Sequence, residues 1–450
     1  MVPDTKEELD VVSIENLLLR ENRHYRELNR VRNSLAFKLG IEIVAAIKFP
    51  PRIILLPFIL PWKVVDYGLS RLGKKKYIQT ELQSLDRKRR KSIVMFPTNG
   101  VGFGHFTRLL SVARAIKKID SEVEIVFFTT MSTLHLCKSE GIISYRIPGR
   151  KEFDDLDAAG WNALTEETLS TVFSAHRPMM FVFDGAFPYR GMLNSINGRN
   201  DMKRIWLKRG TMKKNATNIP RDSLEHFDHI IRPQDSVKLS ITDEFPSDLD
   251  IVQCNPIILL ERNELFSREI SRSRLGISPH LTVVYIQLGA GNINKIGTII
   301  NQCIQILQKV KNVHVVIGES IIGKPVKISG PRVQILRDYP NSLYFNGFDF
   351  AIIAGGYNSY HETIYHALPA ICIPNTNTGM DDQLARADVA GKNKSMLVLE
   401  DAGLADLEES IGKMLDPEFR SRLRARCAET SLTNGAEDSA KFMLEMIDDS

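Results

Sequence analysis

Short runs of apolar residues alternate with helical patterns along most of the chain. Apolar residues from Leu109 to Ile116 recur at helical spacing between two such runs. Buried strands that alternate with helices are typical of a parallel sheet covered on both faces. Before residue 258 the runs are Ser92–Phe96, Val123–Phe128, Met179–Phe183 and His229–Ile231.

A second stretch repeats this pattern after residue 275. The sequence therefore predicts an α/β protein with two Rossmann-like, doubly wound parallel-sheet domains that face a cleft. We expect a helical, basic N-terminal arm at residues 1–91, the two domains at 92–258 and 259–425, and a C-terminal helix at 426–450. The apolar runs of the second stretch are Leu281–Ile286, Val313–Ile317, Val333–Leu336, Phe350–Ile353 and Ala370–Ile373.

The first predicted strand is followed by a glycine-rich loop, NGVGFGHFTR, at residues 99–108. Ligands of such sheets bind beyond the carboxyl ends of the strands. Gly102 and Gly104 let the backbone approach a ligand, and the start of the next helix offers free N–H groups to polar oxygens. The spacing departs from the dinucleotide fingerprint GxGxxG, and Thr129 and Thr130, not an acidic residue, follow the second strand.

His105 and Asp184 are the candidate catalytic residues of the first domain. His105 lies where a strand passes into a helix, so it is a candidate base for an acceptor hydroxyl. The alternative is a histidine that caps the helix or bonds the loop. Asp184 follows Met179–Phe183 and either orients His105 or acts as the base. Its structural alternative, which we favour, is a turn aspartate that bonds its own loop amides.

The most informative loop follows Phe350–Ile353 and reads AGGYNSYHE over residues 354–362. Its glycines expose the start of a helix, where the dipole and free N–H groups favour a diphosphate. Glu362 lies about two turns further on, and a carboxylate there can accept both hydroxyls of a ribose. The ligand-binding candidates in this loop are Gly355, Gly356, Tyr357, Asn358, Ser359 and Glu362.

A small-residue loop also follows the strand predicted at Leu281–Ile286. Small residues between a strand and a helix suit a phosphate. The alternative is an ordinary tight turn. The candidates in this loop are Gly289, Ala290, Gly291 and Asn292.

A polar loop follows the strand predicted at Ala370–Ile373 and ends in Asp381, Asp382 and Gln383. Its side chains suit sugar hydroxyls, so Asp382 and Gln383 are ligand-binding candidates. The alternative for the two aspartates is capping of the next helix. We expect at least one of them to cap and Gln383 to face the ligand.

The pattern GGYNSYHE…ALPAICIPN…DDQ over residues 355–383 strongly resembles the donor half of GT-B glycosyltransferases. The closest likeness is to the family of the lipid-II-forming N-acetylglucosaminyltransferase, the glycosyltransferase family 28 C-terminal domain. The NGVGFGH loop resembles the first loop of that family's acceptor domain, and the likeness spans about residues 92–445. The chain departs from the family at Leu384, where the family has a second glutamine, and in Asp184–Phe187, which replaces a glycine-rich acceptor loop.

The resemblance implies a role for several of these residues. Glu362 would hold the ribose, and Gly356, Asn358 and Ser359 would face the diphosphate. Gln383 would face the donor sugar, while Gly289 to Asn292 would form the other phosphate loop. The first domain would then bind the acceptor, with Gly102 and Gly104 in its first loop.

Composition and charge narrow the class of protein. The chain is 43% hydrophobic and 25% charged, with a net charge of +5 that is too small to indicate nucleic acid as a partner. We expect reduced, mostly buried thiols in a cytoplasmic protein, because no cysteines are paired by spacing. The five cysteines are Cys137, Cys254, Cys303, Cys372 and Cys427.

No metal or other cofactor is expected. The triplets Asp155–Asp157 and Asp248–Asp250 match the DxD spacing of metal-binding transferases, but neither follows a predicted strand. A helix dipole and backbone amides would stabilise the leaving diphosphate instead. The expected reaction is an inverting displacement in which a base deprotonates the acceptor hydroxyl.

The basic segment Trp206–Lys214, with Arg209, follows a short apolar run. It is a candidate to meet an anionic part of the acceptor, such as a lipid pyrophosphate. A solvated basic loop is the commoner outcome for such a segment.

The N-terminal arm is apolar and basic. Residues 35–60 are rich in apolar side chains, and Pro50, Pro51, Pro57 and Pro61 are expected to break any continuous helix. The clean apolar run Ile53–Leu60 is short of the ~20 residues needed to span a bilayer. With Trp62 and the basic runs that follow, the arm is predicted to lie in the interface of an anionic membrane. The alternative is an arm packed on the catalytic domains.

Together these features predict a glycosyltransferase that uses a UDP-sugar as substrate and a glycan or lipid-linked acceptor. It would be peripheral on the inner face of the membrane, with other glycan-assembly enzymes as partners. One alternative is a UDP-sugar 2-epimerase, which shares this architecture and needs no acceptor. Another is a non-catalytic anchoring subunit that recruits a separate transferase.

Overall fold

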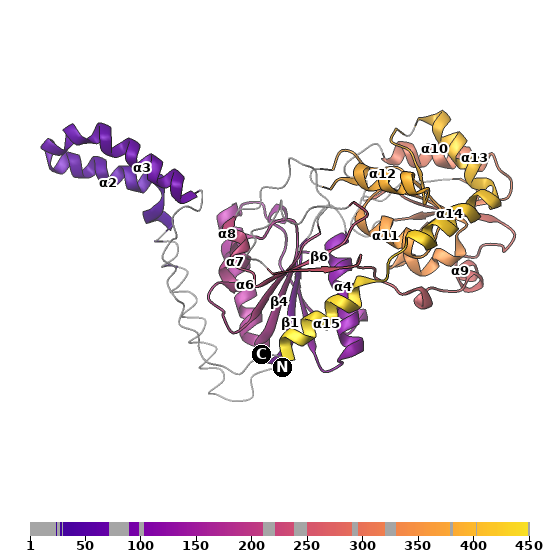
Figure 1. Ribbon diagram of the computed structural model, residues 1–450, viewed down its shortest axis with the longest axis horizontal. Helices are drawn as coiled ribbons and strands as arrows, with labels where there is room; N and C mark the ends of the chain where they lie inside the picture. The colour runs from indigo at the N-terminus through magenta and orange to yellow at the C-terminus, as the bar shows by residue number, and fades with distance from the viewer. Residues whose placement is uncertain are drawn as a thin grey trace.

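The computed structural model shows two parallel sheets, each covered by helices, and a helical arm that projects from the side of the first (Figure 1). It describes His24, Leu28 and residues 30–71, 90–98, 103–209, 221–237, 250–289, 296–319, 330–378, 381–401 and 403–448.

The first sheet has the strand order β3-β2-β1-β4-β5-β6-β7, and its neighbouring strands pair in parallel. Successive residues of a strand point to opposite faces, and both faces here are apolar, so the strands are continuous apolar runs. The strands are β1 (Arg90–Pro97), β2 (Glu124–Thr129), β3 (Ile143–Arg146), β4 (Pro178–Asp184), β5 (Lys203–Leu207), β6 (His229–Pro233) and β7 (Asp250–Cys254).

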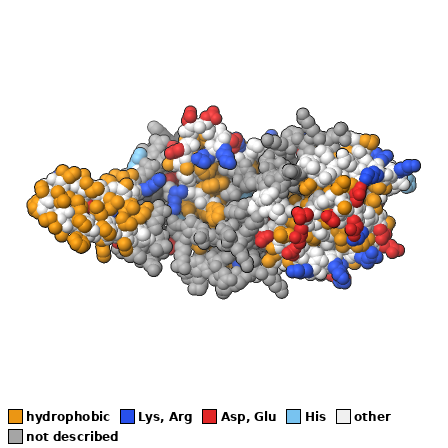
Figure 2. Space-filling view, turned by 90° about the horizontal axis from the view of Figure 1, so that it is seen from above, with side chains coloured by type: hydrophobic (Ala, Val, Ile, Leu, Met, Phe, Trp, Pro, Cys, Tyr) orange, Lys and Arg blue, Asp and Glu red, His pale blue; other side chains and the backbone are white. Residues whose placement is uncertain are grey.

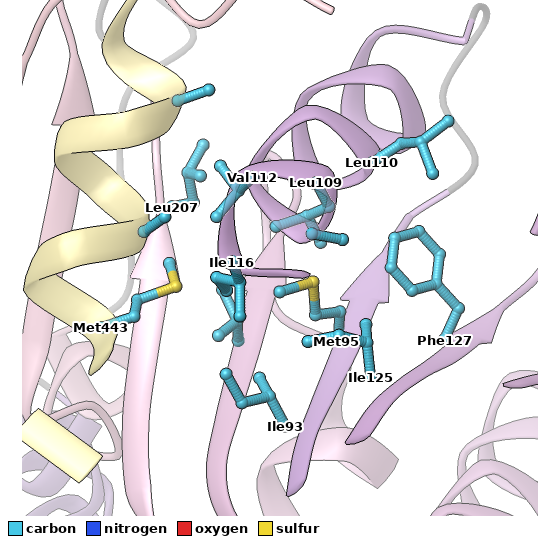
Figure 3. Packing of buried hydrophobic residues seen from close by; sticks show 14 of the residues in the cluster. Ile93, Met95, Leu109, Leu110, Val112, Ile116, Ile125, Phe127, Leu207 and Met443 are labelled. Atoms are coloured by element: carbon cyan, nitrogen blue, oxygen red, sulfur yellow. The ribbon is translucent and has the colours of Figure 1, made fainter. Parts of the chain in front are cut away.

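Helices cover both faces of this sheet. On one face α4 (Gly104–Ile119) packs its buried side chains on alternate residues of the strands, such as Ile93 and Met95 (Figure 3). On the other face, which is rich in phenylalanine, lie α6 (Ala158–His176), α7 (Arg190–Ile196) and α8 (Arg221–Leu224). The remaining short elements of this part are α5 (His135–Ser139) and η2 (Arg150–Glu152).

The second sheet has the order β10-β9-β8-β11-β12-β13, also with parallel pairing. On one face pack α10 (Ile296–Gln308) and α13 (Leu404–Leu415), and on the other α11 (Tyr357–Tyr365) and α12 (Gln383–Asn393). The helix α14 (Pro417–Thr430) contributes buried residues to the clusters of both faces. Nearby are η3 (Arg262–Glu264), α9 (Arg268–Arg274) and η4 (Asn341–Gly347). The strands are β8 (Thr282–Gln287), β9 (Val313–Gly318), β10 (Val333–Leu336), β11 (Phe350–Ile353), β12 (Ala370–Cys372) and β13 (Leu397–Val398).

The last helix, α15 (Gly435–Asp448), returns to the first sheet. Met443 lies beside Ile116 and Leu207 (Figure 3), and its helix shares the core of α4. Asn434, just before the helix, fixes this return because its side chain accepts from the Ile258 N–H at 2.9 Å. The chain end therefore joins the two sheets a second time.

The predicted α/β fold with two doubly wound parallel sheets is confirmed. The patterns missed β3, β5, β7 and β13, which are short or carry polar residues. All five cysteines are free and buried, as expected.

The arm is a helical hairpin of α2 (Leu35–Lys48), the short turn η1 (Pro50–Leu55) and α3 (Leu56–Arg71). Pro50 and Pro51 end the first helix as expected, but the prediction that Pro57 and Pro61 break the second is wrong. Pro57 lies in the first turn, where an N–H has no helical partner, and Pro61 inside α3 removes only one backbone bond. No helix within the described ranges is both long and apolar enough to cross a membrane.

Candidate functional site

The candidate site lies where the carboxyl ends of the first sheet meet α11 and α12 of the second. Residues after β1, β4, β5 and β6 approach the starts of these two helices, and α4 contacts α11 directly. Two loops of this region are only partly described, so the predicted ligand-binding residues Gly102, Ala290, Gly291 and Asn292 lie outside the described residues.

His105 and Asp184 form a hydrogen-bonded pair on the first domain. The His105 Nδ1 lies 2.6 Å from Asp184 Oδ1, and Arg108 binds both carboxylate oxygens, at 2.7 and 3.0 Å. The favoured interpretation of Asp184 is a turn aspartate that bonds its own loop amides. This interpretation is wrong, because the carboxylate binds side chains of α4. The alternative that it orients His105 fits this geometry.

The protonation of this pair follows from its surroundings. Burial raises the pKa of Asp184, but Arg108 and His105 outweigh it, so the pKa stays below its usual value and the carboxylate is ionised. Burial lowers the pKa of His105, Asp184 opposes this, and the net pKa is below its ordinary value. An ionised carboxylate only accepts, so we assign the proton of the neutral imidazole to Nδ1. Nε2 then holds the lone pair that a base needs, with no bonded partner among the described residues.

The start of α11 has no side-chain cap, and Gly356 is its N-cap. The first-turn N–H groups have no helical partner. Asn358 in the first turn has a buried side-chain oxygen that finds no hydrogen-bond partner in the part of the chain that the structure describes. A buried acceptor of this kind costs about 1–3 kcal/mol, which a ligand hydroxyl that donates to it would recover.

Glu362 is a partly buried carboxylate one helical turn after Asn358. Residues four apart share a helix face, so both unpaired groups face the same way. The carboxylate has no hydrogen bond within the described part of the chain, and burial alone raises its pKa to about 7. Its negative charge contributes to the raised pKa of Tyr285 in β8 and of Tyr339. Tyr339 bonds Thr107 of α4 at 2.9 Å, so Glu362 lies close to the junction of the domains.

The loop before α12 also lies at the start of α11. Gln383 is buried; its Oε1 accepts from Asn375 N–H at 3.0 Å, and a Cβ added at Gly356 would lie 3.9 Å from its Nε2. Asp382 caps α12 by accepting from Ala385 N–H at 3.0 Å, which confirms the capping expectation. Gln383 is thus the member of this loop that is positioned beside the α11 start.

A network of buried ion pairs joins the two domains beside this helix. Arg386 of α12 donates to both Asp235 oxygens, at 2.7 and 2.9 Å, and to Asp381 at 3.0 Å. Asp235 follows β6, so this pair crosses between the domains. Arg209, after β5, crosses in the same way to Asp381 at 3.0 Å. The predicted acceptor-side Arg209 is therefore part of an interdomain contact, not a solvated loop.

Burial and charge act against each other in this network. Burial by itself raises the pKa of Asp235, but Arg386 and His361 outweigh it and hold that pKa well below its usual range. His361 of α11 lies 3.1 Å from the same carboxylate, and burial lowers the pKa of its imidazole. Asp235 is therefore ionised, and His361 is neutral and donates to it.

Tyr357, the first residue of α11, is enclosed by this network. Its hydroxyl donates to the Gln234 carbonyl at 3.1 Å, and its side chain thus faces the first domain. Any contact of Tyr357 with an anion would come from its backbone N–H. The guanidinium groups of Arg108, Arg209 and Arg386 lie 5.4, 5.9 and 5.8 Å from its ring centre.

Gly289 and Gly355 have structural reasons for being glycine. Gly289 has a φ of 96°, a left-handed conformation that other residues rarely adopt. Gly355 packs closely on Gln383, and its carbonyl accepts from Arg386 at 2.6 Å. Gly104 begins α4, one residue before His105.

Sequence reasoning missed Arg108, Asp235, His361 and Arg386. A signal existed for Arg108, which follows His105 by three residues on one helix face, and for Asp235, which follows a strand as Asp184 does. The described residues contain no cluster of three or more His, Cys, Asp or Glu side chains that would hold a metal ion. Asp157 of the first DxD triplet caps α6.

Comparison with solved structures gives the fold. The chain is similar to the glycotransferase of kitacinnamycin, with a TM-score of 0.55 and 14% identity over 80% of this chain and 100% of that one. It is similar to MurG of Acinetobacter baumannii (TM-score 0.52, 11% identity, 79% and 100% covered). It is also similar to the UDP-GlcNAc 2-epimerase of Neisseria meningitidis bound to UDP-GlcNAc (TM-score 0.55, 12% identity, 80% and 100% covered).

No family model matches the chain, and no curated protein matches it in sequence. The architecture is that of GT-B glycosyltransferases, as the resemblance predicted.

The raised pKa of Glu362 predicts a pH-dependent stability. The folded protein holds the Glu362 proton more tightly than the unfolded chain, so ionisation costs stability as pH rises from 4.5 to about 7. Glu362→Gln keeps a neutral side chain at every pH. Its free energy of unfolding relative to the parent should therefore increase across this range and then level off, as measured by denaturant titration. A difference that does not change with pH would show that Glu362 titrates normally.

Proposed function

We propose that this protein is an inverting, metal-independent glycosyltransferase that moves a sugar from a UDP-sugar to a cell-surface glycan or lipid-linked precursor. One observation carries the proposal. An uncapped helix start with the unpaired Asn358 and Glu362 lies on one domain, and the His105–Asp184 pair lies on the other. The fold shared with glycosyltransferases supports it.

The donor would bind on the second domain. The diphosphate would accept hydrogen bonds from the free N–H groups at the start of α11, and the helix dipole would favour its charge. The ribose hydroxyls would donate to the ionised Glu362. Three arginines and three aspartates (Arg108, Arg209, Arg386, Asp184, Asp235 and Asp381) balance one another beside this position. The negative charge of a diphosphate would therefore be stabilised by the N–H groups and the dipole at the start of α11.

The acceptor would be activated from the first domain. Its hydroxyl gives a proton to Nε2 of His105 while the oxygen attacks the anomeric carbon of the sugar. The bond to the diphosphate breaks, UDP leaves toward α11, and the configuration at the anomeric carbon inverts. Asp184 stabilises the imidazolium that forms and keeps the ring in place, as the aspartate of a Ser-His-Asp triad does for its histidine.

A UDP-sugar 2-epimerase is the second candidate, because epimerases are among the solved structures of similar fold. Such an enzyme converts free UDP-sugar without an acceptor, and its reaction does not require a membrane-binding arm. Conversion of UDP-GlcNAc to its 2-epimer by the purified chain alone would favour it. Transfer of labelled sugar to an acceptor would favour the transferase.

The membrane is part of the proposal. A lipid-linked acceptor is reached at a membrane surface, and the arm with its flanking basic residues suits an anionic one. The inner membrane face and contacts with other glycan-assembly enzymes belong to the same proposal. The basic residues 74–76 lie outside the described residues.

Glu362→Ala should weaken UDP-sugar binding by about tenfold to a hundredfold, because hydrogen bonds to a charged group contribute roughly 1.5–3 kcal/mol. Isothermal titration with UDP-GlcNAc and UDP-glucose measures this. Parent affinity should also rise as pH passes about 7, where Glu362 ionises, and this rise should be absent in Glu362→Gln. Glu408→Ala, an exposed carboxylate on α13, is the control. Absence of any nucleotide-sugar binding by the parent would remove the proposal.

His105→Ala should lower kcat by about 10²–10⁴ with little effect on UDP-sugar binding, because it removes the base and not the donor site. The assay follows labelled sugar from UDP-GlcNAc or UDP-glucose into lipid and polymer fractions of added membranes. His135→Ala, an exposed histidine at the start of α5, should keep full activity. Parent kcat should fall on acidification below pH 6.5, since the pKa of His105 is lowered. Unchanged kcat in His105→Ala would assign the base to another residue.

A further inference from the structure

The α2–α3 hairpin carries its apolar side chains on the outside. Most of the large hydrophobic residues exposed anywhere in the described ranges lie between Leu28 and Val65. In the view from above, hydrophobic side chains are spread over the whole arm with hardly a charged one among them, unlike the mixed surface of the second domain (Figure 2). Ile54 and Phe58 at its turn are 77% and 76% exposed.

The acidic side chains of the hairpin lie between its helices and pair with basic ones. Glu42 is buried between the helices and binds Arg52 of the turn at 3.1 Å and Lys63 of α3 at 3.4 Å. Lys38 of α2 lies 3.9 Å from Asp66 of α3. Each acidic residue of the hairpin is thus paired with a basic one across the seam. Soluble helix pairs place apolar residues inside and charges outside, and this pair is arranged in the opposite way.

The backbone of the hairpin is also suited to an apolar medium. Nearly all its backbone groups bond within the helices, as hydrocarbon requires. At the turn, where free N–H groups would be costly, Pro50 and Pro51 have none. Phe49 and Arg52 donate theirs to Ala45 and Phe49 carbonyls. At 1.5 Å per residue, α2 and α3 are roughly 21 and 24 Å long. They are too short to cross the ~30 Å hydrocarbon layer and longer than the about 15 Å of one leaflet, so a hairpin within one leaflet would be tilted.

These features distinguish among possible occupants of the apolar surface. A protein partner or a second copy would cover one face, but exposed apolar residues occupy the outer sides of both helices and the turn: Ile41, Val44, Ile54, Phe58, Trp62 and Val65. Only a surrounding apolar medium covers such a surface. The remaining charge near the turn, Lys48, has a stem long enough to reach the polar headgroups.

We propose that the α2–α3 hairpin inserts as one unit into the hydrocarbon of a single membrane leaflet. This deepens the membrane part of the proposed function, on which it rests. Insertion is driven by apolar area and not by attraction between basic residues and anionic lipid. Glu42 pairs with Arg52 and Lys63 and offsets one of their two charges, which lowers the cost of moving the seam into the membrane.

The test uses the full chain and vesicles of uncharged phosphatidylcholine at high salt. We expect the parent to co-sediment with these vesicles. The fluorescence of Trp62 should be quenched by phosphatidylcholine brominated on its acyl chains. Trp161 and Trp206 are buried in the first domain, so Trp62→Phe should abolish the quenching and identify its source.

The double variant Ile54→Asp/Phe58→Asp should reduce binding at least tenfold. Glu42→Ala should also reduce it, because Arg52 and Lys63 then lose their carboxylate. Leu404→Asp on α13, where the side chain is also exposed, is the matched control and should bind as the parent does. UDP-sugar affinity is measured on the same preparations, so a loss of membrane insertion is distinguished from a loss of the donor site or of folding.

Three results would overturn the proposal. Binding only to anionic vesicles, lost in salt and without acyl-chain quenching, would mean surface attachment. No vesicle binding, with self-association in lipid-free solution that the double variant abolishes, would mean that a second copy covers the hairpin. Unchanged binding of the double variant would assign membrane contact to another segment.

Discussion

The ion pair between Arg386 and Asp235 is the contact on which the candidate site depends. Arg386 is fully buried in the second domain, and Asp235 comes from the end of β6 in the first. The Arg386 guanidinium also donates hydrogen bonds to the carbonyl of Gly355 and the carboxylate of Asp381. One side chain therefore fixes the loop before α11, the loop before α12 and the facing edge of the first sheet.

A buried ion pair of this kind fixes the positions of the groups around it but adds little net stability to the fold. Desolvation of two charges offsets much of their attraction, whereas removal of one partner costs about 3–5 kcal/mol because the other remains buried and unpaired. The arginines and aspartates of the network satisfy one another, and none of them is left to neutralise a ligand. The side-chain oxygen of Asn358 and the carboxylate of Glu362 have no hydrogen-bond partner among the described residues, and they lie on one face of α11. The network thus aligns the helix start, and its charged groups are paired with one another.

The sequence predicted much of this arrangement, but not the contacts between domains. Continuous apolar runs located the long strands because both faces of each sheet are buried. Short strands such as β3 and β13 escaped because two to four residues carry too little pattern. The glycines and Glu362 could be found because a helix start after a strand has a local signature. Asp235 and Arg386 are 151 residues apart, and no local pattern indicates such a pair.

Asp184 and the arm show a second limit of local patterns. A turn aspartate and an orienting aspartate look the same in sequence, and the difference depends on whether α4 presents His105 and Arg108 to it. In the arm, the prolines suggested broken helices, and the inward placement of Glu42 appears only when α2 and α3 are paired. The apolar character of both helices could be read from the sequence, but not which side faces outward.

A crystal structure of the chain with a bound UDP-sugar tests the central claim most directly. The account predicts the diphosphate on the N–H groups of Asn358 and Ser359 at the start of α11. It predicts both ribose hydroxyls on the Glu362 carboxylate, and the anomeric carbon turned toward His105. A nucleotide bound elsewhere, or one at α11 whose ribose does not touch Glu362, would contradict it.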